Sequence, residues 1–159
     1  MTGGKAFTII LKGGFFSAIA ATAISAALIT FLYAAPNAKF SGAGDIARAI
    51  LVMCAFTAVP AGSFGFIAGI LGASWLRVRA PHIRSKLHLL AESLAIGLVL
   101  SLVFPALHSV MNWGTNRPEL IGVKEFAFSL AVGIPCTVLF VLIFGSSLLQ
   151  NTERITRSV

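Results

Sequence analysis

Charged side chains are scarce in this chain of 159 residues: they make up 11% of it, and only five are acidic. A water-soluble domain of this size usually has about a quarter of its residues charged, because charges cover its surface. Apolar residues instead reach 57%, and the mean hydropathy is +0.94. The shortage of charge excludes an ordinary soluble domain and indicates that lipid covers much of the surface.

Acids are so few that the formal net charge is +7, which raises the question of nucleic-acid binding. The basic residues are confined to short segments between long apolar runs, and no basic face alternates with aromatic residues. Anionic lipid head groups explain the same positive charge without a nucleic acid. We therefore expect membrane lipids as partners and no nucleic acid.

Cysteine and histidine are also scarce, which limits the metal and cofactor chemistry. Cys54 and Cys136 each lie within an apolar run, and their spacing gives neither a CxxC pair nor a zinc pattern. All three histidines fall between His82 and His108, on one loop and one helix, whereas a haem held across a bundle needs ligands from two helices. There is no HExxH motif. We expect no metal and no cofactor.

Four apolar runs are each long enough to cross a hydrocarbon core, which needs about 20 helical residues. They cover residues 13–35, 49–76, 87–111 and 126–149. Three of them carry no charge, and the third contains only Glu92. The first run follows two lysines, as a signal peptide would, but it is longer than the apolar core of such a peptide. The sequence thus predicts a single-domain, all-α membrane protein with four transmembrane helices.

The basic residues predict the orientation of these helices. One side would hold eight cations: Lys5, Lys12, Arg77, Arg79, Arg84, Lys86, Arg154 and Arg157. The other side would hold four: Lys39, Arg48, Arg117 and Lys124. Because loops rich in Lys and Arg stay cytoplasmic, both termini should lie inside. The short connections favour an up-down bundle. A bacterial plasma membrane is the expected location, ahead of a mitochondrial inner membrane.

The second apolar run contains a stripe of glycines at separations of three, four and three: Gly62, Gly65, Gly69 and Gly72. These residues share one helix face and let another backbone approach closely. The first run offers two matching sets, Ala18, Thr22 and Ala26, or Ser17, Ala21 and Ser25. The stripe indicates either packing within the bundle or docking of a partner subunit or a second copy. Pro60, in the same run, predicts a bend.

Glu92 is the only acid within an apolar run, and an acid in a membrane helix suggests a function. His88 lies one turn earlier on the same helix face. Lys86 and Arg84 are close enough in sequence to supply countercharge. Glu92 and His88 are therefore candidates for an ion or proton site, or for an interface-paired carboxylate. His108 falls on the opposite face of that helix, which argues against a continuous proton route.

The basic loop before this helix supports two interpretations. Its cations, Arg77, Arg79, Arg84 and Lys86, are an ordinary signal for cytoplasmic orientation. The same side chains could bind anionic lipid or an acidic partner.

Three functional hypotheses follow. The first is a non-catalytic accessory or assembly subunit that packs against a partner or a second copy through the glycine face. The second is a small channel or a carrier for lipid or solute, with Glu92 and His88 at its cytoplasmic mouth. The third is a membrane enzyme that uses the same two residues, for which the sequence supplies no supporting motif.

Overall fold

A computed structural model describes residues 3–34, 36, 40, 42–79, 82–83, 85–112 and 123–156, and the fold is all-helical. Helix α1 (Gly3–Ile29) continues into a π-helical turn η1 (Thr30–Ala34). Helix α2 (Ala43–Thr57), a second π-helical turn η2 (Ala58–Gly62) and helix α3 (Ser63–Arg79) follow one another without a break. Helices α4 (Lys86–Asn112) and α5 (Val123–Thr156) complete the chain.

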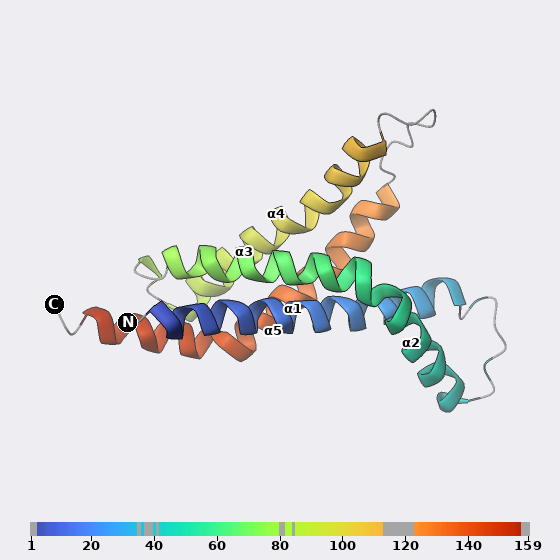
Figure 1. Cartoon of the computed structure of the whole chain (residues 1–159), viewed down its shortest axis with the longest axis horizontal. Helices are drawn as coiled ribbons and strands as arrows, with labels where there is room; N and C mark the ends of the chain where they lie inside the picture. Colours follow the sequence, from blue (N-terminus) through green and yellow to red (C-terminus); the bar gives the residue numbers. More distant parts are fainter. Residues whose placement is uncertain are drawn as a thin grey trace.

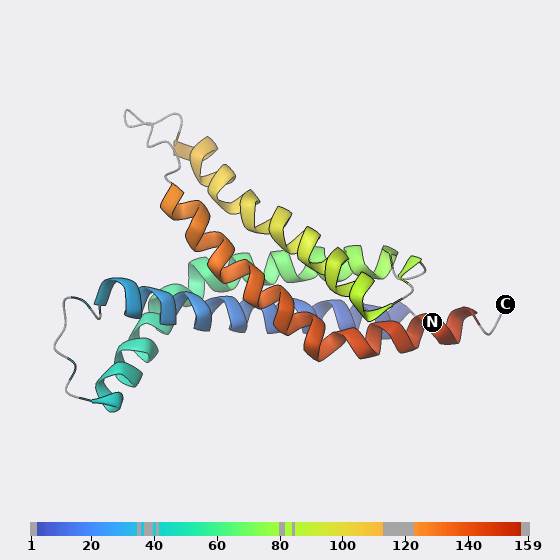
Figure 2. The ribbon, with the colours of Figure 1, turned by 180° about the vertical axis from the view of Figure 1, so that it is seen from behind.

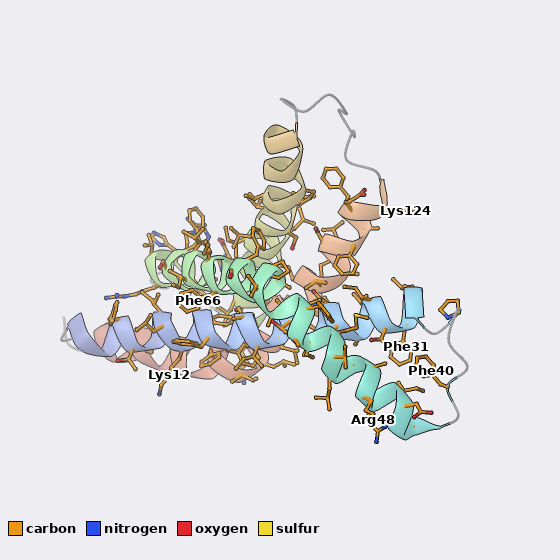
Figure 3. The ribbon with its side chains drawn as sticks, turned by 45° about the vertical axis from the view of Figure 1, so that its right-hand side comes forward. Lys12, Phe31, Phe40, Arg48, Phe66 and Lys124 are labelled. Atoms are coloured by element: carbon orange, nitrogen blue, oxygen red, sulfur yellow. The ribbon has the colours of Figure 1, made fainter. Side chains whose placement is uncertain are left out.

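Four segments of these helices are long and apolar enough to cross a membrane. They are Phe7–Leu32, Ala43–Arg79, Lys86–Val103 and Lys124–Gly145. The predicted set of four membrane-spanning helices is thus confirmed at the level of length and composition. Charged side chains lie near the ends of these segments. Arg48 and Lys12, for example, point away from the neighbouring helices (Figure 3).

The helices form two pairs, which we call the first hairpin (α1 with α3) and the second hairpin (α4 with α5). Contact is most extensive within each pair, and the pairs meet through α1 with α5 and α3 with α4. The pairs lie together where α3 ends and α4 begins, which we call the α3–α4 end (Figure 1). They diverge toward the opposite end, which we call the α4–α5 end, so that the molecule is V-shaped in both views (Figure 2).

The second membrane segment bends at Pro60, as the sequence predicted. Proline has no N–H to donate, and its ring displaces the preceding turn of an α-helix. The chain accommodates both effects by widening into the π-helical turn η2, which contains Pro60. Helix α2 leaves the line of α3 at this turn and slants away from the rest of the molecule (Figure 1).

Many large apolar side chains lie outside, and most of the buried side chains are small or hydroxylated, which is the reverse of a soluble protein. Phe56 is 73% exposed, Leu87 is 78% exposed and Leu142 is 73% exposed. The buried positions include Ala26 and Ser25, on one face of α1. In lipid, apolar surface gains nothing by leaving its surroundings, so helices associate by close packing of small residues. This distribution fits a chain surrounded by hydrocarbon.

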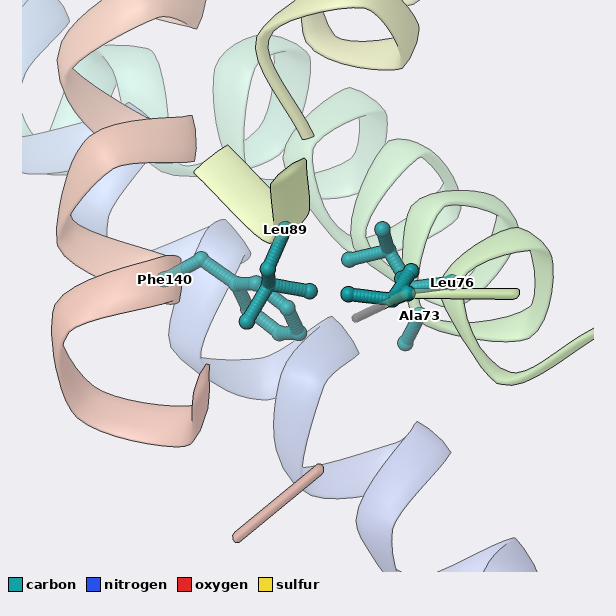
Figure 4. Close-up of a cluster of buried hydrophobic side chains, with 5 residues drawn as sticks. Ala73, Leu76, Leu89 and Phe140 are labelled. Carbon is teal, nitrogen blue, oxygen red and sulfur yellow. The ribbon is translucent and has the colours of Figure 1, made fainter. Parts of the chain in front are cut away.

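The one cluster of buried apolar side chains found among the described residues lies at the α3–α4 end. It contains Ala73, Leu76, Ile83, Leu89 and Phe140. Leu89 and Phe140 approach Leu76 and Ala73 from the opposite hairpin (Figure 4). The aromatic rings of Phe140 and Phe144 stack with their centroids 5.1 Å apart, and Phe16 of α1 meets Phe144 at 5.6 Å. This cluster therefore joins the two hairpins by apolar packing at the α3–α4 end.

Candidate functional site

The predicted glycine stripe lies mostly inside the chain, against α1. A methyl group on Gly65 would lie 2.7 Å from the Ser17 carbonyl oxygen, and one on Gly69 would lie 2.7 Å from the Gly13 carbonyl oxygen. Gly62 faces the Thr22 hydroxyl at 3.0 Å. Both predicted sets of small residues on α1 contribute to this contact. The interpretation as packing within the bundle therefore accounts for these three glycines.

Gly72, the fourth member of the stripe, has a different environment. A methyl group there would meet only Leu100 Cδ1 of α4, at 3.8 Å. Gly72 also lines a central crevice, described below. Three glycines of the stripe thus face α1, within the first hairpin, whereas Gly72 faces α4 of the second hairpin.

The second hairpin is held by small residues that the sequence analysis did not identify. On α4, Gly97 packs against Thr137 of α5, and Gly133 of α5 packs against Ser101 of α4. The sequence does contain a pattern that indicates this packing, namely small residues at a spacing of four, which places them on one helix face. It occurs in two triplets, Ser93, Gly97 and Ser101, and Ser129, Gly133 and Thr137.

A crevice of about 250 Å³ lies between the two hairpins. Its walls come from α1, η2 and α3 on one side and from α4 and α5 on the other. It begins at Leu76 and Phe140, near the buried apolar cluster, and reaches Thr57 and Phe128 toward the α4–α5 end. The hairpins are packed at one end and diverge at the other, so the divergence itself creates this space (Figure 2).

The lining of the crevice is uncharged and mostly apolar. No lysine, arginine, aspartate or glutamate is among the described residues that line it. Several hydroxyl groups line it, and three of them donate their protons within their own helices. Ser93 donates to the Leu89 carbonyl and Ser101 to the Gly97 carbonyl, each at 2.7 Å. Thr137 donates to the Gly133 carbonyl at 2.8 Å. The crevice therefore suits an apolar occupant.

Glu92 lies beside the crevice at the α3–α4 end, in a polar cluster with three neighbours. Arg79 of α3 donates from Nη2 to Glu92 Oε1 at 2.7 Å, and His88 Nε2 lies 3.6 Å from the same oxygen. The side chain of Trp75, on α3, is the third neighbour of Glu92. The Glu92 side chain is only 17% exposed, so this pair links α3 to α4 in a partly shielded environment.

The structure places His88 beside Glu92, as the spacing of four predicted, but the observed countercharge comes from a residue that the sequence analysis did not propose for this role. We expected Lys86 or Arg84 to supply it, because they are near in sequence. The observed partner is Arg79, at the end of α3, because the turn between the helices brings that residue opposite α4. Lys86 is exposed, as is Arg77.

Part of the predicted basic surface lies outside the described residues. This applies to Arg84 and to three cations used for orientation, Lys39, Arg117 and Arg157. Of the predicted basic loop, the structure therefore presents Arg77 and Lys86 as exposed cations and Arg79 as the partner of Glu92.

The structure thus contains a crevice between the two hairpins, whose described lining residues carry no charge. Beside its closed end lies a cluster formed by Arg79, Glu92 and His88. The chain has no match among protein-family models, curated proteins or solved structures.

Proposed function

We propose that this protein is a small membrane carrier that binds an apolar or amphipathic solute in the crevice between its two hairpins. The observation that carries the proposal is the crevice itself, which all four long helices line and whose described lining residues include none with a charge. Ligand sites are generally concave and mostly apolar, with volumes of about 300–1,000 Å³. The volume of about 250 Å³ is close to the lower end of this range.

The accessory-subunit hypothesis has less support from the contacts of the glycine stripe. It required an available glycine face on the second membrane segment, and α1 already covers Gly62, Gly65 and Gly69. Docking of a partner there would first have to displace α1. A carrier needs no such rearrangement, because the space between the hairpins is already present.

Transport of an ion is less well supported than transport of an apolar solute. Moving an ion through hydrocarbon needs charged or well-oriented polar groups along the route. The part of the crevice lining that the structure describes offers none with charge, and the Glu92 carboxylate is already paired with Arg79. We assign this cluster the role of holding α3 against α4 at the closed end, rather than that of conducting a cation.

We further propose an up-down bundle in a bacterial plasma membrane, with both termini and the α3–α4 end in the cytoplasm. The excess of Lys and Arg on that side supports the orientation. In a variant without Cys54 and Cys136, a membrane-impermeant maleimide should label Gly42→Cys from outside the cell. It should label Ser85→Cys only after the membrane is opened. Labelling of Ser85→Cys in intact cells would overturn the orientation.

Filling the crevice should stop transport. A tryptophan at Gly72 can be accommodated, because a side chain there meets only Leu100 at first contact, and its ring would then occupy the crevice. We expect wild-type protein to carry a fluorescent lysophospholipid across phosphatidylcholine vesicles, and Gly72→Trp to reduce the rate to that of protein-free vesicles. Protection of the probe from an external quencher measures the rate.

The matched control for this experiment is Gly44→Trp. Gly44 lies on α2, outside the crevice, and a side chain there meets nothing within 4 Å. We expect this variant to transport at the wild-type rate. Absence of transport by wild-type protein, or equal transport by both variants, would contradict the carrier function.

A further inference from the structure

The crevice is elongated along the helices. Its lining on α1 runs from Ser17 to Ile29, and its lining on α5 runs from Phe128 to Phe140. Residues twelve positions apart on a helix are separated by about 18 Å. One leaflet contributes about 15 Å of hydrocarbon, half of a core about 30 Å thick. The crevice is therefore about as long as one leaflet is deep.

The crevice is also small compared with a transmembrane helix. Its volume of about 250 Å³ is just below that of pockets that hold drug-sized molecules, about 300–1,000 Å³. A helical segment about 18 Å long and about 10 Å across occupies about 1,400 Å³. The volume thus favours a small or chain-like occupant over a partner helix.

The lining determines the chemistry of such a chain. A polar group in the crevice would lose its hydrogen bonds to water, which carries a substantial free-energy cost when no new partner is supplied. The hydroxyl protons of Ser93, Ser101 and Thr137 are already donated to backbone carbonyls, and none of the lining residues seen in the described ranges is charged. A hydrocarbon chain has no polar atoms to satisfy and loses nothing there.

Phe140 closes the crevice at the α3–α4 end. It belongs both to the lining and to the buried cluster, and it is 6% exposed. Its ring is held from behind by the ring of Phe144, at 5.1 Å between centroids. Ala73 and Leu76 approach it from α3 (Figure 4). A chain that enters from the diverging end would stop against this ring.

We propose that the crevice takes one hydrocarbon chain of an amphiphile and that Phe140 sets the chain length it accepts. The inference rests on the proposed carrier function, because it takes the crevice as the binding site, and it adds the class of ligand and the residue that selects it. The polar head of the amphiphile stays near Thr57 and Phe128, where the crevice ends toward the α4–α5 end. A phospholipid and a free fatty acid both supply the required chain.

The test measures binding as a function of chain length. The full chain, in lipid nanodiscs, is exposed to fatty acids of ten to eighteen carbons that carry a photoreactive diazirine at the methyl end. A parallel series of lysophosphatidylcholines distinguishes the two sources of the chain. Methylenes are solvated equally well by the surrounding lipid, so the preference comes from close packing in the crevice: a chain that leaves part of it empty loses contacts, and a chain that is too long is blocked. The yield of labelled protein should therefore rise with length until the crevice is filled and fall beyond that length. The label on the longest accepted chain should map to the floor, at Phe140 or Ala73.

Phe140→Ala should move the maximum of this profile to longer chains, and Phe140→Leu should move it less in the same direction. The leucine variant keeps a buried apolar side chain and serves if the alanine variant does not fold. Phe56→Ala is the matched control, since it removes an equal ring that is 73% exposed and does not line the crevice. An unchanged maximum in both Phe140 variants, or wild-type labelling that does not depend on chain length, would overturn the inference.

The labelling experiment and the transport experiment test different claims, so one can fail while the other succeeds. A length-dependent profile that shifts in the Phe140 variants, without transport by wild-type protein, would support the chain site and contradict the carrier function. Transport by wild-type protein with a fixed maximum would support the carrier function and overturn the role of Phe140.

Discussion

Replacing Gly69 by leucine should separate α1 from α3 and destabilise the whole protein. A methyl group at this position would lie 2.6 Å from Ser17 Oγ and 2.7 Å from the Gly13 carbonyl oxygen. The serine hydroxyl can rotate, but the carbonyl belongs to the backbone of α1, so the helix itself has to move. Overpacking of this kind costs about 3 kcal/mol, at the upper end of the usual range. Because α1 and α3 form the first hairpin, we expect little folded protein.

Unfolding in detergent, followed by circular dichroism during a titration with sodium dodecyl sulfate, measures this loss. Gly44→Leu is the control, because it makes the same substitution on α2 where nothing lies within 4 Å. Its unfolding midpoint should match that of the wild-type protein. If Gly69→Leu unfolds at the wild-type midpoint, the close contact of α1 with α3 is not a determinant of stability.

Reversing the charge of Glu92 should open the α3–α4 end. In Glu92→Arg, a second guanidinium would face Arg79, whose Nη2 atom now lies 2.7 Å from a carboxylate oxygen. His88, one turn away, adds a third basic group. Like charges brought together repel strongly where solvent screening is reduced. We expect several-fold less monodisperse protein in detergent and a lower unfolding temperature.

The double variant Arg79→Glu/Glu92→Arg tests whether the pair itself is responsible. It restores opposite charges at the same two positions, so its yield and unfolding temperature should approach those of the wild-type protein. Equal damage in the single and double variants would show that the ion pair does not hold α3 to α4.

The number of membrane helices could be predicted from the sequence because lipid thickness requires long apolar runs. The ends of the helices could not. Residues 49–76 were predicted for the second segment, and the helical path extends from Ala43 to Arg79. Helical hydrogen bonding continues into charged flanks, as at Asp45 and Arg79, whereas an apolar run ends at the first charge.

The candidate site was predictable only in part. The spacing of four between His88 and Glu92 is a property of one helix and could be recognised directly. Pairing with Arg79 depends on how the turn after α3 orients that helix against α4, which no local pattern specifies. The crevice depends on the divergence of the hairpins. The triplets of small residues on α4 and α5 indicate close packing of that pair, but not the angle at which the pair meets α1 and α3.

The V shape has a mechanical consequence in a bilayer. The helices are packed at the α3–α4 end and spread at the other, where α2 also slants outward (Figure 1). A body of this outline takes up more area in one leaflet than in the opposite one. Its free energy therefore depends on the lateral pressure of each leaflet separately. Membrane curvature and the balance of lipids between the leaflets then act on the angle between the hairpins.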